Sequence, residues 1–418
     1  MTEQTFTPTR AAGLARLASF QPQMGRHYAN MRNHDLGPND RSNVSALSPW
    51  ARCRLLTEQE LAEAALNKFA LSTAEKFVQE VCWRTYWKGW LQHRPGVWSA
   101  YQAAVRRDHE ALARNAGLRT AYSEATTGQT GIAVFDAWTR ELIETGYLHN
   151  HSRMWFSSIW IYTLKLPWAL GADFFLQHLM DGDAASNTLS WRWTAGLHTQ
   201  GKIYLARPDN IAKYAGGRFE AELGADWRAG LDRLAKAAPA LEGDANPSPG
   251  GLGVADTVPD GSFGLLLTEE DLHPASLLPP GSRVAAIAGA SFAAQRSAQG
   301  VGQAAEAFVT GALDDALAAA AQTFGAEALR LSTETPFEEA VLAWAQGAGV
   351  RTVVTAEPPV GWVKPHLDAF KAALSAQGIN LVYLRRPWDE AFWPHARKGF
   401  FALKKKIPSV LAELGLPA

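Results

Sequence analysis

The chain has 418 residues, 47% of them hydrophobic and 19% charged, with a formal net charge of −1. This is the composition of a soluble globular protein, and the length allows two or three domains. No apolar run is long enough for a membrane span, the N-terminus has no signal-peptide core, and two cysteines exclude both a disulfide framework and a four-cysteine iron–sulfur site. We therefore expect a cytoplasmic protein.

The charges are distributed unevenly. Residues 1–230 hold 25 Lys and Arg against 21 Asp and Glu, whereas the remainder holds 15 against 20. A basic first part beside an acidic second part suits an anionic partner for the first part. Chance variation among solvated side chains is the alternative explanation.

Composition divides the chain into four parts. Residues 1–20 read as a loose N-terminal tail, and residues 21–235 as a helical, aromatic domain. Twelve of the 16 tryptophans precede residue 230. Residues 236–262 are rich in Pro, Gly and Ala and poor in large apolar side chains, which predicts a linker.

The last part, residues 263–418, has a different pattern. Ala-rich helical stretches separate most of its short apolar runs, which lie at 263–268, 284–288, 327–332, 352–356 and 379–384. This alternation predicts a parallel sheet covered by helices. The predicted fold is therefore an all-helical domain followed by a Rossmann-like α/β domain.

Residues 128–219 contain four predicted helices. Apolar residues recur at helical spacing from Val134 to Ile143, and Gly146 follows as a C-terminal stop. The next helices are predicted from about residue 152 to before Pro167, over about residues 172–180, and from the turn at residues 181–183 to near residue 196.

Polar side chains concentrate at the ends of these helices. Asp183, Asn187 and Trp191 follow one another at intervals of four residues, so they share one helix face. Carboxylates, amides, a guanidinium and indoles would then converge at helix N-termini. We predict a pocket for a large, flat, polar ligand.

Three other motifs fail on inspection, and we expect no metal site. Residues 181–192 begin like a calcium loop but place Ser186 and Arg192 where glycine and glutamate belong. The pair His149 and His151 lacks a third ligand. The dinucleotide-like pattern at 300–305 lies too far past its strand.

The stretch from Thr130 to Trp193 resembles the photolyase/cryptochrome flavoprotein family. It reads TG-x4-DA-x2-R-x-L-x2-TG-x2-HN-x2-RM and then L-x-DGD-x-A-x-N-x3-W-x-W, with no gap. The resemblance extends upstream to Glu80-x-x-Trp83-Arg84, to Ser45-x-Leu47-Ser48-Pro49 and to Tyr28. It is strongest to the cyclobutane pyrimidine dimer photolyases.

The second domain also resembles part of that family. Residues 263–274 are similar to a degenerate form of the strand and turn that open the family's antenna domain. In the family this domain precedes the flavin domain, so the resemblance implies an exchanged domain order. An unrelated α/β domain is the alternative, and the identity of an antenna chromophore stays open.

The resemblance implies non-covalent FAD within residues 28–210. Arg153 and Asp181 match the ion pair over the isoalloxazine, and Asn187 matches the residue that faces flavin N5. The further implied contacts are Tyr28, Val44, Ala46, Leu47, Arg84, Asp183 and the pyrophosphate-binding hydroxyls of Ser45 and Ser48. Val44 stands where a threonine is usual, so one hydrogen bond is expected to be lost.

The resemblance also implies light-driven DNA repair, in which excited reduced flavin gives an electron to a pyrimidine dimer that has left the duplex stack. Glu80 matches the carboxyl on the dimer's base edges, and Trp83 and Trp193 match its apolar walls. The other implied contacts are Met154, Asn150, and Arg32 and Arg207 on phosphates. His151 replaces a common arginine. The expected partner is DNA that contains pyrimidine dimers. We expect no membrane association and a monomeric protein.

Photoreduction is the second point of departure from the family. Trp191 and Trp168 match the first two members of its tryptophan relay, whereas the third position falls near Asn115. Tyr122, Trp155 or Trp160 could replace it. With Glu80, Met154 and Asn187, the two relay tryptophans complete the expected catalytic set.

Two other functions remain open. One is a cryptochrome-like photoreceptor, against which the retained Glu80, Met154 and Trp193 argue, because a receptor needs no lesion pocket. The other is a light-independent flavoprotein or scaffold. The sequence does not distinguish single-stranded from double-stranded DNA as the preferred substrate.

Overall fold

The four helices predicted in residues 128–219 are present in the computed structural model, which describes residues 6–333 and 337–417. Helix α8 (Ala133–Thr145) ends at Gly146, whose φ of 64° is left-handed and therefore suits glycine. Helix α9 (Asn150–Ser158) continues into a π-helical turn, Ile159–Thr163. Helix α10 (Trp168–His178) begins directly after Pro167, earlier than predicted.

Helix α11 (Ala184–Thr194) owes its start to Asp183. The carboxylate of Asp183 accepts a hydrogen bond of 2.7 Å from the Ser186 backbone N–H, which satisfies one of the free donors at the helix N-terminus. The same cap fixes the face that Asn187 and Trp191 present.

The N-terminal segment differs from the predicted tail, of which residues 1–5 lie outside the described residues. Helix α1 (Arg10–Phe20) starts at Thr9, whose hydroxyl accepts from the Ala12 N–H, and it buries Leu17 and Phe20. Arg10 also pairs with Glu60 at 2.5 Å. A cap and two apolar residues at helical spacing were sufficient to order this segment against the domain.

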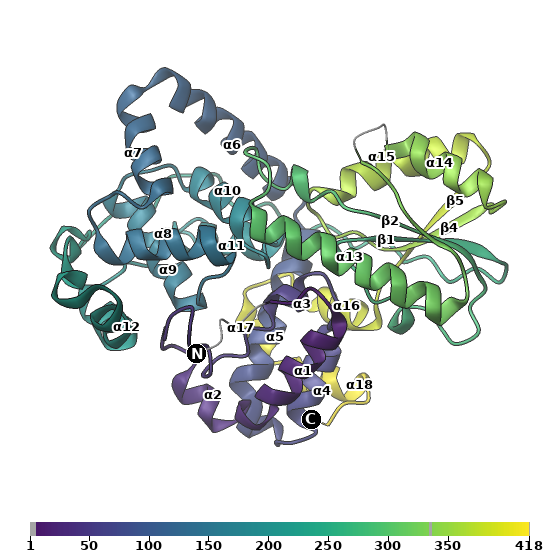
Figure 1. The fold of residues 1–418 in the computed structure, drawn as a ribbon, viewed down its shortest axis with the longest axis horizontal. Coiled ribbons are helices and arrows are strands. Elements are labelled where there is room, and N and C mark those ends of the chain that lie inside the picture. The colour runs from purple at the N-terminus through teal and green to yellow at the C-terminus, as the bar shows by residue number, and fades with distance from the viewer. Residues whose placement is uncertain (1–5, 334–336, 418) are drawn as a thin grey trace.

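Helices of 5 to 22 residues form the rest of the first domain (Figure 1). They are α2 (Arg26–Met31), α3 (Ser48–Arg52), α4 (Glu58–Leu66), α5 (Leu71–Gln92), α6 (Gly96–Arg114), α7 (Ala116–Thr127) and α12 (Pro208–Leu223). Short 3₁₀ turns follow α1 and α12. No helix of the described residues is long and apolar enough to cross a membrane.

The second domain contains the predicted parallel sheet. Its strands are β1 (Phe263–Thr268), β2 (Val284–Ala290), β3 (Ala328–Arg330), β4 (Thr352–Ala356) and β5 (Asn380–Leu384). They pair in the order β3-β2-β1-β4-β5, all in parallel. Helices α13 (Gln303–Phe324), α14 (Phe337–Gly347) and α15 (Val363–Ala376) connect them. The α/β architecture predicted from the sequence is confirmed.

The three last helices return to the first domain. They are α16 (Pro387–Phe392), α17 (Phe400–Lys404) and α18 (Ile407–Glu413). The Trp388 indole N–H donates to the Thr85 hydroxyl on α5 at 2.9 Å, and Phe400 lies on Trp83 of the same helix. The linker is also fastened, because the Gly250 N–H donates to the His93 carbonyl at 2.8 Å.

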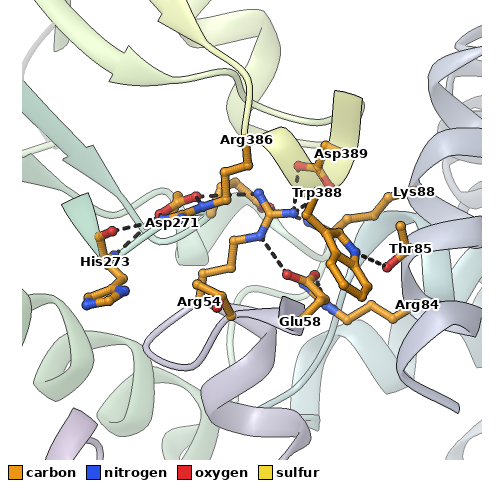
Figure 2. Close-up of polar contacts among 12 residues, drawn as sticks. Arg54, Glu58, Arg84, Thr85, Lys88, Asp271, His273, Arg386, Trp388 and Asp389 are labelled. Atoms are coloured by element: carbon orange, nitrogen blue, oxygen red, sulfur yellow. Dashed lines mark hydrogen bonds and ion pairs between the residues drawn. The ribbon is translucent and has the colours of Figure 1, made fainter. Parts of the chain in front are cut away.

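A buried ion-pair network joins the domains (Figure 2). Arg54 contacts Asp389 at 2.7 Å, Glu58 at 3.1 Å and Asp271 at 3.4 Å. Asp271 in turn pairs with Arg386 at 2.6 Å. Because these charges are buried, each one depends on its partners for the interactions that water would otherwise supply.

Candidate functional site

The inner face of α11 holds three of the predicted site residues. Asp183, Asn187 and Trp191 are 3%, 8% and 2% exposed, as their shared spacing predicts. The Asn187 amide donates to the Ala172 carbonyl at 2.8 Å. That bond orients the side chain by its amide nitrogen and does not use its carbonyl oxygen.

Arg153 and Asp181 form the predicted ion pair. A guanidinium nitrogen of Arg153 lies 2.8 Å from Asp181 Oδ2, and its Nε donates to the Leu148 carbonyl at 2.9 Å. The second oxygen, Asp181 Oδ1, is buried and has no hydrogen-bond partner among the described residues. A ligand that donates a hydrogen bond there would satisfy it.

Asp183 and Arg84 are held by neighbours as well. Asp183 lies 3.3 Å from the Lys88 ammonium and 3.6 Å from the Arg84 guanidinium. Burial alone would raise the pKa of Asp183, but Lys88, Arg84 and Arg52 lower it below its usual range. The sequence prediction missed Lys88, although it lies one helical turn after Arg84 on α5.

The predicted pyrophosphate loop is organised from α1. Arg16 donates to the carbonyls of Ser45 and Val44, both at 2.7 Å, and Ala46 takes a left-handed φ of 51°. The hydroxyls of Ser45 and Ser48 make no hydrogen bond to other described residues and so can bind a ligand. Arg16 was missed because it lies in the segment predicted as a tail.

Tyr28 and Leu47 lie deeper in the same region. Tyr28 packs edge-on against Phe77 at 5.4 Å and Phe20 at 6.0 Å between ring centroids. Burial holds the pKa of the Tyr28 phenol well above its usual value. Leu47 is 2% exposed, so both residues contribute walls rather than charge.

The predicted lesion contacts lie farther out. Glu80 and Arg32 form an ion pair at 2.5 Å, with side chains 32% and 26% exposed. Trp83, Met154 and Trp193 are partly exposed, and Asn150 and Arg207 are exposed. His151, which replaces an expected arginine, stacks on Trp155 and interacts with the Asn33 carbonyl at 3.1 Å.

Trp83 has a partner that the sequence did not indicate. Phe400 of α17 stacks on it with 3.7 Å between ring centroids and 12° between planes. Trp193 stacks on Tyr204 at 5.7 Å. The sequence offered no signal for Phe400, because it lies far along the chain from Trp83, in another predicted domain.

Aromatic contacts connect two of the three candidate replacements to Trp191, the first predicted relay member, rather than to Trp168, the second. Trp160 lies 6.1 Å from Trp191, and Tyr122 lies 5.9 Å from Trp160, between ring centroids. Trp155 packs instead against Trp138. Trp168 contacts Tyr101 at 5.7 Å, and its part in a relay remains a prediction.

Residues 77–216 match the family model described as the FAD binding domain of DNA photolyase. This part of the helical domain is therefore similar to the FAD-binding domain of the photolyase family. The match begins within α5 and ends within α12, and it includes the predicted Glu80, Trp83, Arg153, Asp181 and Asn187.

Individual relatives agree with the family. The deoxyribodipyrimidine photo-lyase of Streptomyces griseus is 33% identical over 222 residues, which are 49% of this chain and 47% of that protein. One from Thermus thermophilus is 32% identical over 204 residues, 47% and 45% of the two chains. The cryptochrome DASH of Gloeobacter violaceus is 29% identical over 223 residues, 50% and 41%. The chain spans about half the length of the curated relatives it matches.

Two solved structures are similar to part of the chain. The match to a cryptochrome from Synechocystis covers 53% of this chain and 44% of the cryptochrome, with 23% sequence identity and a TM-score of 0.38. A bacterial class III photolyase from Agrobacterium tumefaciens covers 54% and 44%, with 24% identity and a TM-score of 0.40.

The residues present fit FAD. Asp181 Oδ1 and the Asn187 carbonyl can accept from a flavin, and the two serine hydroxyls can donate to a phosphate. These groups lie on α3, α11 and the turns before them. FAD is therefore the cofactor of this domain, and the individual contacts remain predictions.

Proposed function

We propose that the protein is a light-driven DNA-repair flavoenzyme, a deoxyribodipyrimidine photolyase that splits cyclobutane pyrimidine dimers. The observation that carries this proposal is the layering of the site. All the predicted flavin contacts are at least half-buried, and five of them are fully buried: Tyr28, Ala46, Leu47, Asp183 and Asn187. None of the predicted lesion contacts is fully buried, and Asn150 and Arg207 are exposed. A photoreceptor that only holds flavin does not need the outer layer.

When bound and reduced, FAD would supply the excited-state electron for the splitting reaction. The chain's own residues position the reactants. Asn187 presents a neutral acceptor, which suits reduced flavin without adding charge. Glu80, held by Arg32 at 2.5 Å, is oriented to accept from the base edges of a flipped dinucleotide. Trp83 and Trp193 provide apolar walls.

The direct test is a repair assay on oligonucleotides that carry one pyrimidine dimer. We expect loss of dimers only under blue or near-ultraviolet light, on single-stranded or double-stranded DNA or both. Purified protein that binds flavin but leaves dimers intact under illumination would instead support the cryptochrome-like alternative, for which the similarity to a cryptochrome DASH is the specific observation.

A pair of variants tests the outer layer in the dark. Trp83→Ala should weaken discrimination between damaged and undamaged DNA by about tenfold, because stacking on an aromatic wall contributes about 1–3 kcal/mol per base. Arg207→Ala, which removes an exposed cation, should weaken both complexes equally and lower the salt slope by about one unit. Flavin content should not change in either variant.

Arg32 is not a suitable phosphate control. Its removal also releases Glu80 from their ion pair, so it affects lesion contacts and phosphate contacts together. If Trp83→Ala weakens binding to both DNAs equally while Trp193→Ala does the same, the lesion-pocket assignment is wrong.

A further inference from the structure

We propose that residues 397–406, the basic segment around α17, form a DNA-binding surface in which Phe401 acts as a wedge beside the flipped nucleotide. This inference rests on the proposed repair function. It concerns a segment outside the residues that match the family model, which end at 216.

The segment is strongly and uniformly basic. Its ten residues, RKGFFALKKK, contain five cations and no acidic residue. Arg397, Lys398, Lys405 and Lys406 are exposed, and Lys404 is partly exposed. The second part of the chain has an excess of acidic residues, so this concentration of positive charge departs from its own domain and suits a polyanion such as a DNA strand.

The segment also contacts α5, the helix that carries the predicted lesion contacts Glu80 and Trp83. Phe400 stacks on Trp83 at 3.7 Å, and the Lys404 ammonium lies 3.0 Å from Glu75 on the same helix, α5. Glu80 follows Glu75 on that helix and pairs with Arg32. The basic segment therefore continues the surface formed by the predicted lesion contacts.

Phe401 points into solvent. It is 74% exposed, although the neighbouring Phe400 is buried. Among the Phe, Tyr and Trp residues that the structure describes, Phe401 is the only exposed one. An exposed aromatic side chain within a basic segment is the arrangement that proteins use to insert between base steps.

The duplex gives such a wedge a function. When a dinucleotide leaves the stack, the duplex is left with a gap that exposes the faces of the adjacent bases. Phe401, beside the Trp83 wall, can fill that gap, while the lysines hold the flanking phosphates. A single strand can rearrange freely and has no such gap, so the wedge should matter only for duplex DNA.

The experiment measures binding in the dark of the FAD-loaded full chain to dimer-containing and undamaged oligonucleotides, each as single strand and duplex, at several salt concentrations. Phe401→Ala should lower affinity for the damaged duplex by about tenfold and for the damaged single strand by less than about twofold. Lys405→Gln with Lys406→Gln should weaken all four complexes and lower the salt slope by about two units.

The matched control removes the same charge elsewhere. Lys364→Gln with Lys371→Gln changes two cations on α15 of the α/β domain and should leave all four complexes unchanged. If the α17 lysine variant behaves like this control, the proposed DNA-binding surface is wrong. If Phe401→Ala weakens binding to single-stranded and duplex DNA equally, the proposed wedge role of Phe401 is wrong. A wild-type protein without preference for damaged DNA would contradict the proposed function instead.

Discussion

His149 links acidity to the position of predicted DNA contacts. Its Nδ1 accepts a hydrogen bond of 3.1 Å from the His151 backbone N–H, so its Nε2–H donates to the Arg32 carbonyl at 3.0 Å. Burial lowers the pKa of His149 to about 4, although Asp35 opposes the shift. Protonation of Nδ1 would abolish the cap of α9, the helix that carries Asn150 and Arg153.

We therefore expect stability to fall as the pH drops from about 6.5 to about 4. Between these pH values the folded protein binds fewer protons at His149 than the unfolded chain does, because the pKa of His149 is lower in the folded state. The stability that neutral His149 contributes is therefore fully present above the unfolded pKa and is lost as the pH falls, by about 3 kcal/mol at most. His149→Asn retains a helix cap without a titrating ring. It should reduce the slope of unfolding free energy against pH by an amount that corresponds to about one proton. Chemical denaturation between pH 4 and 8 measures it, and an unchanged slope would contradict this account.

Substitution of Asp181 tests the predicted flavin-binding residues. Asp181→Ala removes the carboxylate that pairs with Arg153 and leaves its guanidinium with the Leu148 carbonyl and the Tyr147 ring. It also removes the free acceptor, so we expect lower flavin content and a loss of about 1–3 kcal/mol in unfolding free energy. The control is Asp209→Ala, whose partner Arg207 is 67% exposed and 3.6 Å away. That change should cost less than about 0.5 kcal/mol. Flavin absorbance per protein and denaturant midpoints give both quantities, and full flavin retention in Asp181→Ala would count against the site.

Gly171 shows how α10 and α11 pack. An added Cβ there would lie 2.5 Å from Cζ3 of Trp191 and 2.9 Å from Cε2 of Trp160. Both indoles are almost fully buried and cannot move aside easily. The glycine therefore permits the close approach of the two helices and the contact between the two indoles.

Substitution of this glycine should destabilise the protein. Gly171→Ala is expected to lower the unfolding free energy by about 1–2 kcal/mol, because overpacking of a rigid core outweighs the improved helix propensity. Gly217→Ala in α12, where an added Cβ meets nothing within 4 Å, should instead raise it by about 0.5–1 kcal/mol. Thermal unfolding of both variants and the wild-type protein measures these changes. A Gly171→Ala variant more stable than the wild-type protein would show that the two indoles can move apart.

Local patterns predicted these elements better than they predicted the contacts between them. Periodicity and the stop at Gly146 were sufficient for α8, and apolar runs were sufficient for the five strands. By contrast, the Phe400–Trp83 stack joins positions far apart in sequence, and no local pattern encodes such a pair. The tail prediction was wrong at α1 because its apolar stripe, Leu17 and Phe20, is short.

The two domains share a charged core, and this should make them unfold together. Arg54 is the centre of that core, since it contacts Glu58 from its own domain and Asp271 and Asp389 from the other. Arg54→Ala should destabilise the protein by about 3–5 kcal/mol, because Asp389 would be left buried without its cation. Unfolding followed by tryptophan fluorescence and by circular dichroism should give one transition in the wild-type protein.

A second substitution distinguishes lost charge balance from lost packing. Asp389→Asn in the Arg54→Ala background removes the stranded carboxylate and should recover part of the stability, which a double-mutant cycle reports. No recovery would mean that Arg54 acts through packing alone. Two separate transitions in the wild-type protein would show that the network does not couple the domains.

Arg54 and Asp389 are separated by 335 positions along the chain. A ribosome adds about 5–20 residues per second, so Arg54 is made tens of seconds before its partner exists. During that interval Arg54 has Glu58 as a partner but lacks Asp271 and Asp389, and the surface that the later helices will cover stays open to water. Nascent chains halted before residue 389 should therefore be cleaved readily by proteases around α3 and α4, and resistance should appear only once α16 has left the exit tunnel.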